Sequence, residues 1–442
     1  MDKTVLALKI AEKVKEEGGR VFYVGGCVRD FLLGVENKDI DIEVHGITPE
    51  KLREILEGFG TPLSFGKSFG VYSLKGYDID IAMPRREKAI GKGHRDFEVD
   101  VDPFIGLKEA ARRRDFTINA LMRDVLTGEI IDSFGGVNDL EDKVLRCVDE
   151  TTFIEDPLRV LRCAQFAARF RFSIDPRTLE LCRSIDLSTL HKQRVEEELE
   201  KALLKADTPS IFFTSLKDMD QLSFWFKELE ELIGLKQDPI YHPEGDVFTH
   251  TMEVLDRGAM YRDKVKEPYG FMLLCLAHDL GKITTTEEIN GRIHAYGHET
   301  EGLPLIRTFI GRFLDEKEPL KYILNMTPLH MRPFSLAAAK ASIKSTNRLF
   351  DEANEPLDLI YFSLADKGIH AKKEDVDYLF ARYEIFKEYM ARDHVTGKDL
   401  IDAGLKPDES FSKILAYAHK LRLAGVEKDA ALKQTLAYAG KL

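Results

Sequence analysis

The order of apolar and polar residues divides the chain into two parts that differ in period. Up to about residue 150, short β-branched and aromatic runs alternate with glycine-rich turns, which is typical of a sheet carrying helices. Thr48 and Pro49 predict the start of a helix over 48–59, because Thr caps helices and Pro fits their first turn. Residues 1–19 predict an amphipathic helix. Strands are predicted at 21–24, 40–44, 71–74, 78–82 and 130–132.

Beyond about residue 150 the strand signal ends and helical periodicity continues almost to the last residue. The pattern predicts an α+β chain, with a mixed head followed by an all-helical remainder. Six of the twelve histidines fall within 240–330, which indicates a separate chemical unit there. Boundaries are predicted near 150, 235 and 375.

Composition narrows the classes of protein. With 44% hydrophobic and 32% charged residues, the 442-residue chain resembles globular proteins with large cores. Its longest apolar run, 269–277, is far shorter than the ~20 residues of a membrane span, and the charged N-terminus is unlike a signal peptide. The net charge of −12 means that nucleic acid can bind only through a local basic patch. Five dispersed cysteines without C-x-x-C predict reduced thiols and a cytoplasmic location.

A glycine pair opens the first candidate site. Gly25 and Gly26 follow a predicted strand and precede a helix predicted over 29–33. Glycines there let the backbone turn and expose N–H groups to an anion, and Arg29 adds a fork of donors suited to phosphate. A simple turn is the alternative interpretation.

Two aspartates follow at i and i+2. On a strand, Asp39 and Asp41 project from the same face, where two carboxylates repel each other unless a cation lies between them. Paired carboxylates beside a phosphate loop are typical of two-Mg²⁺ phosphoryl transfer. Asp78 and Asp80 repeat the spacing on a later strand, so Asp80 is a possible third carboxylate. A solvated edge strand is the alternative for both pairs.

Three arginines, Arg112 to Arg114, precede Asp115 within a helical pattern. Such a cluster suits a triphosphate, although solvated basic turns are also common.

The segments GGCVRDFLLG, KDIDIE, RRRDFTINAL, IIDSFGG and IEDPLRVLRCAQFAARF, in this order, resemble the class II tRNA nucleotidyltransferases, the CCA-adding enzymes. That family shares its head with bacterial poly(A) polymerases. The resemblance implies a nucleotidyltransferase head with a palm-like mixed sheet, followed by helical neck, body and tail. It implies Mg²⁺-dependent addition of CTP and ATP to tRNA 3′ ends without a template. The domains are then 1–148 (head), 149–234 (neck and body), 235–374 (histidine-rich domain) and 375–442 (tail).

The last of these motifs has a chemistry of its own. Asp156, Arg159 and Arg162 are spaced three apart and line one face of a helix. Cytosine and adenine each present an amino donor beside a ring-nitrogen acceptor, which a carboxylate and a guanidinium match. Guanine and uracil reverse these groups, so one Asp–Arg pair can select C and A. A salt-bridged helix face is the alternative.

By this resemblance, Gly26 and Arg29 hold the triphosphate and Asp39 and Asp41 the metals. Arg113, Arg114 and Asp115 contact sugar and phosphates, and Asp156 and Arg159 read the base with support from Arg162. Arg194 and Glu198 match an element that supports the base-reading helix. The sequence departs from the family at Gln165, where relatives often carry Arg, so no phosphate contact is assigned there.

The histidine-rich region contains an ordered series: His250, the doublet His278-Asp279, and Asp366. Each lies in or at the end of an apolar run, where an unpaired polar group is costly and a divalent metal resolves that cost. The series resembles the HD phosphohydrolase superfamily, which implies hydrolysis of phosphomonoesters or 2′,3′-cyclic phosphates with Mn²⁺, Ni²⁺ or Mg²⁺. Lys282 could contact phosphate, and His298 and His330 could extend the site to a second metal. Structural roles are expected for His242, His294 and Asp246.

Two alternatives remain open. One is a poly(A) polymerase or an enzyme that adds only A or only CC. The segment 66–70 lacks the doubled basic residues of the polymerase branch, and the region from Arg85 to Pro103 keeps the loop length that full CCA addition needs. The other is a non-catalytic RNA-binding protein with a vestigial HD fold, against which the retained carboxylates argue.

Overall fold

The computed structural model describes residues 2–35, 40–64, 70–89 and 97–441. Asp39 and the segment 66–69 therefore lie outside the described residues. The chain forms two compact units, the first made of residues 1–202 and 211–225, the second of 203–210 and 226–442.

A seven-stranded mixed sheet organises the head, in the order β3-β4-β5-β2-β1-β8-β9. β2 pairs antiparallel with β1 and parallel with β5, and this register places Asp41 opposite Asp80. The strand predicted at 71–74 is confirmed with the same ends and the other four predicted strands with shifted ends, whereas β3, β8 and a separate β6–β7 hairpin were not predicted. The strands are β1 Arg20–Val24, β2 Asp41–His45, β3 Pro62–Ser64, β4 Val71–Leu74, β5 Asp80–Ala82, β6 Arg85–Ala89, β7 Phe97–Val101, β8 Met122–Asp124 and β9 Ile130–Ile131.

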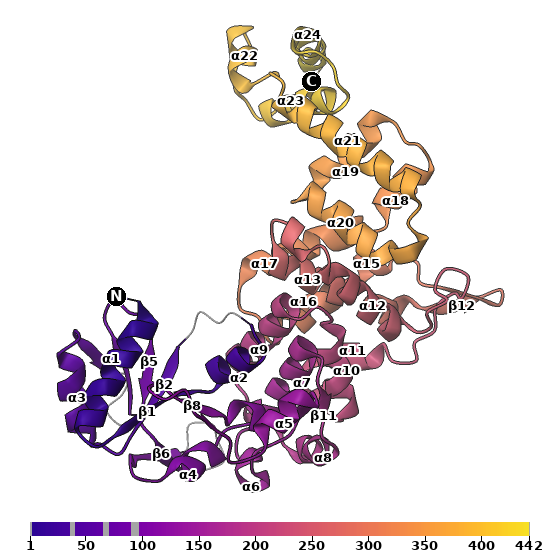
Figure 1. Ribbon diagram of the computed structural model, residues 1–442. Helices are drawn as coiled ribbons and strands as arrows, with labels where there is room; N and C mark the ends of the chain where they lie inside the picture. Colours follow the sequence, from indigo (N-terminus) through magenta and orange to yellow (C-terminus); the bar gives the residue numbers. More distant parts are fainter. Residues whose placement is uncertain (1, 36–39, 65–69, 90–96, 442) are drawn as a thin grey trace. The chain divides into compact units, whose positions relative to one another are not determined.

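Helices cover the sheet. α1 (Lys3–Glu16) and α3 (Pro49–Glu57) pack their apolar faces on one side of it, and Figure 1 shows both helices beside the strands. Thr48 caps α3 as predicted. α2 (Gly26–Leu32) begins three residues earlier than expected, directly after the glycine turn. α4 (Leu107–Arg112) ends before Arg113 and Arg114, so the prediction of three arginines inside a helix was wrong.

The rest of the first unit is mainly helical. Nine of the thirteen residues of α7 are buried, which makes this helix its central element. β10 (Val144–Leu145) and β11 (Ser173–Ile174) form a short parallel pair that the sequence did not predict. α11 is kinked at Phe226, where the chain passes into the second unit. The helices are α5 Gly136–Glu141, α6 Glu150–Phe153, α7 Leu158–Phe170, α8 Pro176–Ser184, α9 Lys192–Lys205, α10 Ser210–Asp218 and α11 Leu222–Glu231.

The second unit is helical with one exception. β12 (Glu287–Ile289) and β13 (Arg292–His294) form a hairpin, so the prediction of no strands after residue 150 was wrong. Asn290 and Gly291 both have positive φ, as a two-residue Asn-Gly turn requires, and this dipeptide was the overlooked signal. The helices, all but α14 labelled in Figure 1, are α12 Val247–Ala259, α13 Pro268–Ala277, α14 Lys282–Thr285, α15 His298–Glu301, α16 Leu303–Gly311, α17 Lys317–Met326, α18 Arg332–Ala338, α19 Ile343–Glu352, α20 Pro356–Lys367, α21 Lys373–Ala391, α22 Gly397–Asp402, α23 Phe411–Leu423 and α24 Lys428–Ala439.

Two further observations concern the cysteines and the apolar character of the helices. All five cysteines are free, and four of them are buried. Among the described helices, none combines the length and apolar character needed to cross a bilayer.

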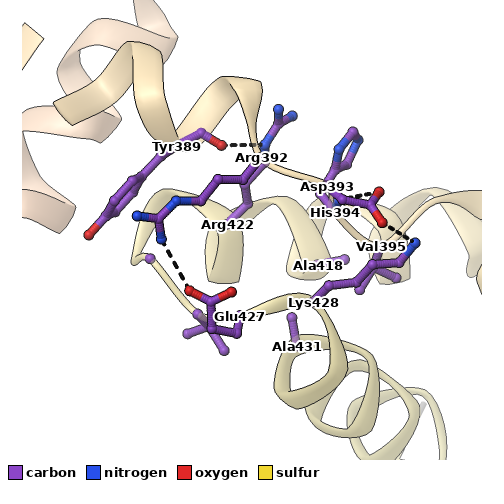
Figure 2. Close-up of a pocket in the computed structure, with 12 residues that line it drawn as sticks. Tyr389, Arg392, Asp393, His394, Val395, Ala418, Arg422, Glu427, Lys428 and Ala431 are labelled. Atoms are coloured by element: carbon purple, nitrogen blue, oxygen red, sulfur yellow. Dashed lines mark hydrogen bonds and ion pairs between the residues drawn. The ribbon is translucent and has the colours of Figure 1, made fainter. Parts of the chain in front are cut away.

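A small pocket opens between α21, α23 and the start of α24 (Figure 2). Its cations already have partners. Arg392 contacts Glu388 and Glu427, Arg422 donates to the carbonyl of Tyr389, and Lys428 contacts Asp393. Ion pairs and a hydrogen bond within the protein therefore already occupy the three cations Arg392, Arg422 and Lys428.

Candidate functional site

A cavity of about 400 Å³ lies in the first unit and gathers residues from three separate motifs. Some of its lining residues come from β2 and β5, and others come from the turn after α4 and from the segment that leads into α7. The lining residues are Val24, Asp41, Ile42, Glu43, Val71, Asp80, Ala82, Arg85, Arg113, Arg114, Asp156 and Arg159. The fold thus brings the predicted carboxylate strand, two predicted phosphate-binding arginines and the predicted base-reading pair to one place.

Two carboxylates of this cavity sit side by side on neighbouring strands. Asp41 on β2 and Asp80 on β5 are partners in the parallel register, Asp41 half-buried and Asp80 exposed. Asp78 differs: it precedes β5, its side chain is 88% exposed, and Lys3 lies 3.6 Å away. Of the second aspartate pair, only Asp80 therefore belongs to the cavity.

Glu43 is a site residue that the sequence interpretation missed. It is buried, and its carboxylate accepts from Arg114 Nη2 at 3.2 Å and contacts His45 Nε2 at 2.8 Å. Burial alone would raise the pKa of Glu43, but the hydrogen bond to His45 and the charge of Arg114 lower it to about 2. The anionic side chain holds Arg114 at the cavity wall. The available signal was the continued i, i+2 alternation after Asp41.

The predicted base-reading pair, Asp156 and Arg159, has a geometry that differs from the prediction. Asp156 precedes α7, and its Oδ1 accepts from the N–H of Leu158 at 3.0 Å, so it is not on a helical face. Arg159 lies in the first turn and donates to the carbonyls of Thr152 at 2.9 Å and Arg113 at 2.6 Å. Both side chains still line the cavity.

Three predicted nucleotide-binding residues are instead joined in a buried network. Arg29, only 4% exposed, donates to Asp30 Oδ1 at 2.8 Å and to Asn119 Oδ1 at 2.6 Å. Asn119 Nδ2 donates to Asp115 Oδ1 at 2.9 Å, and Arg162 contacts Asp115 Oδ2 at 2.7 Å through two nitrogens. Burial would raise the pKa of Asp115, but the neighbouring Arg162 lowers it. None of Arg29, Asp115 and Arg162 is among the lining residues. The network ties α2 to α7.

The remaining predicted residues border this arrangement. Glu198 on α9 is 2% exposed, and its Oε1 lies 3.8 Å from Arg162 Nη1. Arg194 contacts Glu197 on its own helix, with 3.7 Å between Nε and Oε2. Gly25 has a φ of +68°, and a Cβ there would lie 3.2 Å from Arg114 Nη1. A side chain at Gly25 would therefore be strained and would crowd Arg114.

The second candidate site is a cluster of histidines and aspartates in the second unit. It contains all four predicted members and the two proposed extensions, which come from α12, α20 and the ends or starts of shorter helices. The members are His250, His278, Asp279, His298, His330 and Asp366.

The two aspartates connect the histidines. Asp366 Oδ1 lies 3.1 Å from His250 Nε2 and 3.7 Å from His278 Nε2. Asp279 Oδ2 lies 3.3 Å from His278 Nε2, and its Oδ1 lies 3.2 Å from His298 Nε2. Ligating atoms of Asp279, His298 and His330 also lie within 4.8 Å of one another.

The ring nitrogens of these histidines are arranged for metal binding. Nδ1 bonds the carbonyl of the residue three positions earlier in His278, His298 and His330, at 3.1, 2.8 and 2.6 Å. Donation from Nδ1 leaves Nε2 as the basic nitrogen of a neutral imidazole. Nε2 of His278 and of His298 is buried without a hydrogen-bond partner among the described residues. Two such orphaned nitrogens beside carboxylates fit a divalent metal.

Charge in the cluster is unevenly distributed. Burial would lower the pKa of His250, but hydrogen bonds to Asp366 and Glu244 raise it to about 9. Burial lowers the pKa of His330 to about 4, and the nearby His278 adds to this effect. The anionic form of Asp366 is favoured because hydrogen bonding to His250 outweighs burial and lowers its pKa.

Four residues near the cluster were given roles from the sequence, and their contacts agree with those roles only in part. Lys282 is 8% exposed and contacts Asp279 Oδ2 at 2.7 Å, so it is already paired. Asp246 caps α12 and accepts from the N–H of Gly234, the structural role expected for it. His294 stacks on Tyr296 in the hairpin region. His242, by contrast, packs edge-on against His250 with 4.8 Å between ring centroids, directly at the cluster.

Comparisons with known proteins agree with this division into two sites. Residues 21–146 match the family model of the poly A polymerase head domain, and residues 247–368 match that of the HD domain. The multifunctional CCA protein of Pasteurella multocida is 40% identical over 304 residues, covering 66% of this chain and 70% of that protein. The multifunctional CCA protein of Alkalilimnicola ehrlichii is 34% identical over 421 residues, covering 93% of this chain and 98% of that protein.

Solved structures support the same fold. A Thermotoga maritima CCA-adding enzyme complexed with tRNA has a TM-score of 0.67 at 22% identity, covering 99% of this chain and 96% of that chain. A Bacillus stearothermophilus CCA-adding enzyme in complex with CTP has a TM-score of 0.66 at 20% identity, covering 100% of this chain and 99% of that one. The chain matches the models of the head domain and of the HD domain, and it is similar to a multifunctional CCA protein over nearly its full length. It therefore belongs to the family of multifunctional CCA proteins.

Proposed function

We propose that the chain adds C, C and A to tRNA 3′ ends from CTP and ATP by two-metal nucleotidyl transfer. The observation that carries the proposal is the cavity in which Asp41, the two arginines after α4 and the Asp156–Arg159 pair meet. Relatives named multifunctional CCA proteins, and similar structures of CCA-adding enzymes complexed with tRNA, with ATP and with CTP, support it. In keeping with a tRNA substrate, we propose a cytoplasmic location.

Asp41, together with Asp39 as the sequence predicts, would hold Mg²⁺, and Asp80 is proposed as a third carboxylate. Oxygen donors from carboxylates fit this ion, which prefers hard ligands. When bound, Mg²⁺ would supply charge neutralisation at the triphosphate and a lower pKa for the attacking hydroxyl.

The chain's own residues then position the reactants. The 3′-hydroxyl of tRNA loses its proton to solvent, and its oxygen forms a bond to the α-phosphorus. The bond from the α-phosphorus to the oxygen that bridges to the β-phosphorus breaks, and pyrophosphate leaves with that oxygen. Arg113 and Arg114 stabilise charge on the phosphates, with Glu43 keeping Arg114 in place. Asp156 accepts from the amino group of C or A, and Arg159 donates to the ring nitrogen. Arg29, Asp115 and Arg162 are proposed to act from behind the cavity, by fixing α2 and α7.

We propose a second activity for the HD domain: hydrolysis of 2′,3′-cyclic phosphates and phosphomonoesters, as in the repair of damaged RNA ends. His250, His278, Asp279 and Asp366 would hold one divalent metal such as Mn²⁺, Ni²⁺ or Mg²⁺, and His298 and His330 would extend the site to a second. The bound metal would supply a nucleophile from water at neutral pH. The four-part division into 1–148, 149–234, 235–374 and 375–442 remains our domain proposal.

One experiment tests the leading proposal. tRNA lacking its 3′ end is incubated with labelled CTP and ATP, separately and together, and product lengths are measured. Growth by three nucleotides with both substrates supports CCA addition. A-only addition or long tails with ATP would instead identify a partial-specificity enzyme or a poly(A) polymerase, and no incorporation would favour a binding protein. For the HD domain, hydrolysis of a 2′,3′-cyclic nucleotide stimulated by Mn²⁺ or Ni²⁺ is the corresponding test.

A further inference from the structure

One histidine of the HD cluster is held differently from the others. His278, His298 and His330 bond neutral backbone carbonyls through Nδ1. His250 Nδ1 instead lies 2.7 Å from Oε1 of Glu244, and the same oxygen lies 3.0 Å from His242 Nδ1. The side chain of Glu244 is 13% exposed. Among the four histidines, His250 is therefore the one whose Nδ1 contacts a largely buried carboxylate where the others contact a backbone carbonyl.

Glu244 is on the far side of the His250 ring from the proposed metal ligands. Its contact is to Nδ1, whereas Asp366 and Asp279 approach Nε2 at 3.1 and 3.7 Å. The two nitrogens of an imidazole point in different directions, so a metal bound at Nε2 has Glu244 outside its ligand sphere. Outer carboxylates on ligating histidines fix the ring orientation and raise its basicity.

The segment that carries Glu244 supports a second ligand as well. Gln237 is 8% exposed, and its Oε1 accepts from Lys282 Nζ at 2.7 Å. Lys282 in turn contacts Asp279 Oδ2 at 2.7 Å. Residues 237–244 thus reach one ligand through Glu244 and another through Gln237 and Lys282.

We propose that Glu244 is a positioning residue of the HD metal site and that His242 holds the carboxylate of Glu244 in place. Residues 237–244 then form a segment that orients the metal ligands without binding the metal. The inference rests on the proposed function only in assuming that the cluster binds a metal. Glu244 orients His250 and keeps its proton on Nδ1, so that Nε2 is available to the metal.

Metal affinity of the full chain, stripped of metal and titrated with Mn²⁺ or Co²⁺ by calorimetry, tests this. We expect Glu244→Ala to weaken binding by about 10- to 100-fold. Glu244→Gln keeps an acceptor oxygen at a similar size, so it is expected to recover part of this loss. The matched control is Glu299→Ala, which removes a carboxylate 3.6 Å from His298 Nδ1, a nitrogen already bonded to Ala295. Little change is expected there, as is typical of partly exposed ion pairs.

Further readouts separate the possible failures. Thermal unfolding of the metal-free variants checks that each one folds, and the visible spectrum of bound Co²⁺ reports the ligand set. Affinity in Glu244→Ala equal to that of the parent would overturn the inference. So would the loss of one bound metal equivalent or a spectrum with one ligand fewer, because Glu244 would then be a ligand itself. If His278→Ala binds metal as the parent does, the proposed metal site itself fails.

Discussion

The head cavity and the HD cluster use carboxylates in opposite ways. In the head, Asp41 and Asp80 sit on strands at the wall of an open cavity, one half-buried and the other exposed. In the cluster, Asp279 is 2% exposed and lies between histidines whose Nδ1 atoms are already bonded. The first arrangement leaves room for a charged substrate to complete the site, whereas the second is largely built before any ligand arrives. Oxygen donors in the head suit Mg²⁺, and nitrogen-rich donors in the cluster suit Mn²⁺ or Ni²⁺.

The strongest way to break this comparison is to remove the head carboxylate. Asp41→Ala is expected to reduce incorporation of labelled CTP and ATP by about 10³-fold or more, because metal stabilisation of the transition state contributes several kcal/mol. Cyclic-phosphate hydrolysis by the same preparation should be unchanged. Normal incorporation by a folded Asp41→Ala protein would contradict the assignment of the head site.

The counterpart of Asp41→Ala is a substitution in the HD cluster. His278→Ala is expected to abolish metal-stimulated hydrolysis of a 2′,3′-cyclic nucleotide and to leave CCA addition intact, because the two sites belong to separate units. Both activities are assayed on one preparation. Undiminished hydrolysis would show that the cluster does not carry this activity.

Base selection should depend on the first unit alone. Asp156→Asn replaces an acceptor-only carboxylate by an amide that can also donate, so discrimination against GTP and UTP should fall by about 10- to 100-fold, the size of one lost base contact. Relative kcat/KM for the four nucleotides measures this. Unchanged selectivity with lower overall activity would instead indicate a purely structural role for Asp156.

Metal removal should affect the two regions unequally. A ligand at 100 times its Kd stabilises the folded state by about 2.7 kcal/mol, so Mn²⁺ should raise the Tm of the protein and a chelator should reverse the shift. We expect His278→Ala to lose this stabilisation and Asp41→Ala to keep it. The opposite pattern would place the tighter metal site in the head.

The smallest effect is expected at Asp80. Its exposed carboxylate lies beside Asp41 in register, so Asp80→Asn should slow nucleotide addition less than Asp41→Ala does. The requirement for Mg²⁺ should move to higher concentration, which a magnesium titration of the initial rate measures. An unchanged titration would make Asp80 a solvated strand residue, the alternative that its sequence pattern left open.

The sequence predicted several elements because their signals are local. Thr48 and Pro49 mark the start of α3, and β-branched runs mark the central strands. The missed hairpin around Asn290 and Gly291 was local too, and its turn signal was overlooked within a helical region. The ordered series predicted that His250, His278, Asp279 and Asp366 lie together, and His298 and His330, named as a possible extension, lie beside them.

The sequence alone thus determined which chemical groups the protein carries and in what order. It also determined most strands and helices, because their periods depend only on neighbouring residues. It did not determine that Arg29 and Arg162 are joined through Asn119 and Asp115 and do not line the cavity, or that Glu244 contacts His250 Nδ1. Those contacts join residues from different elements, and burial decides whether a charged group faces a substrate or another side chain. Only the tertiary structure fixes that choice, because a buried charge must find its partner wherever the packing places one.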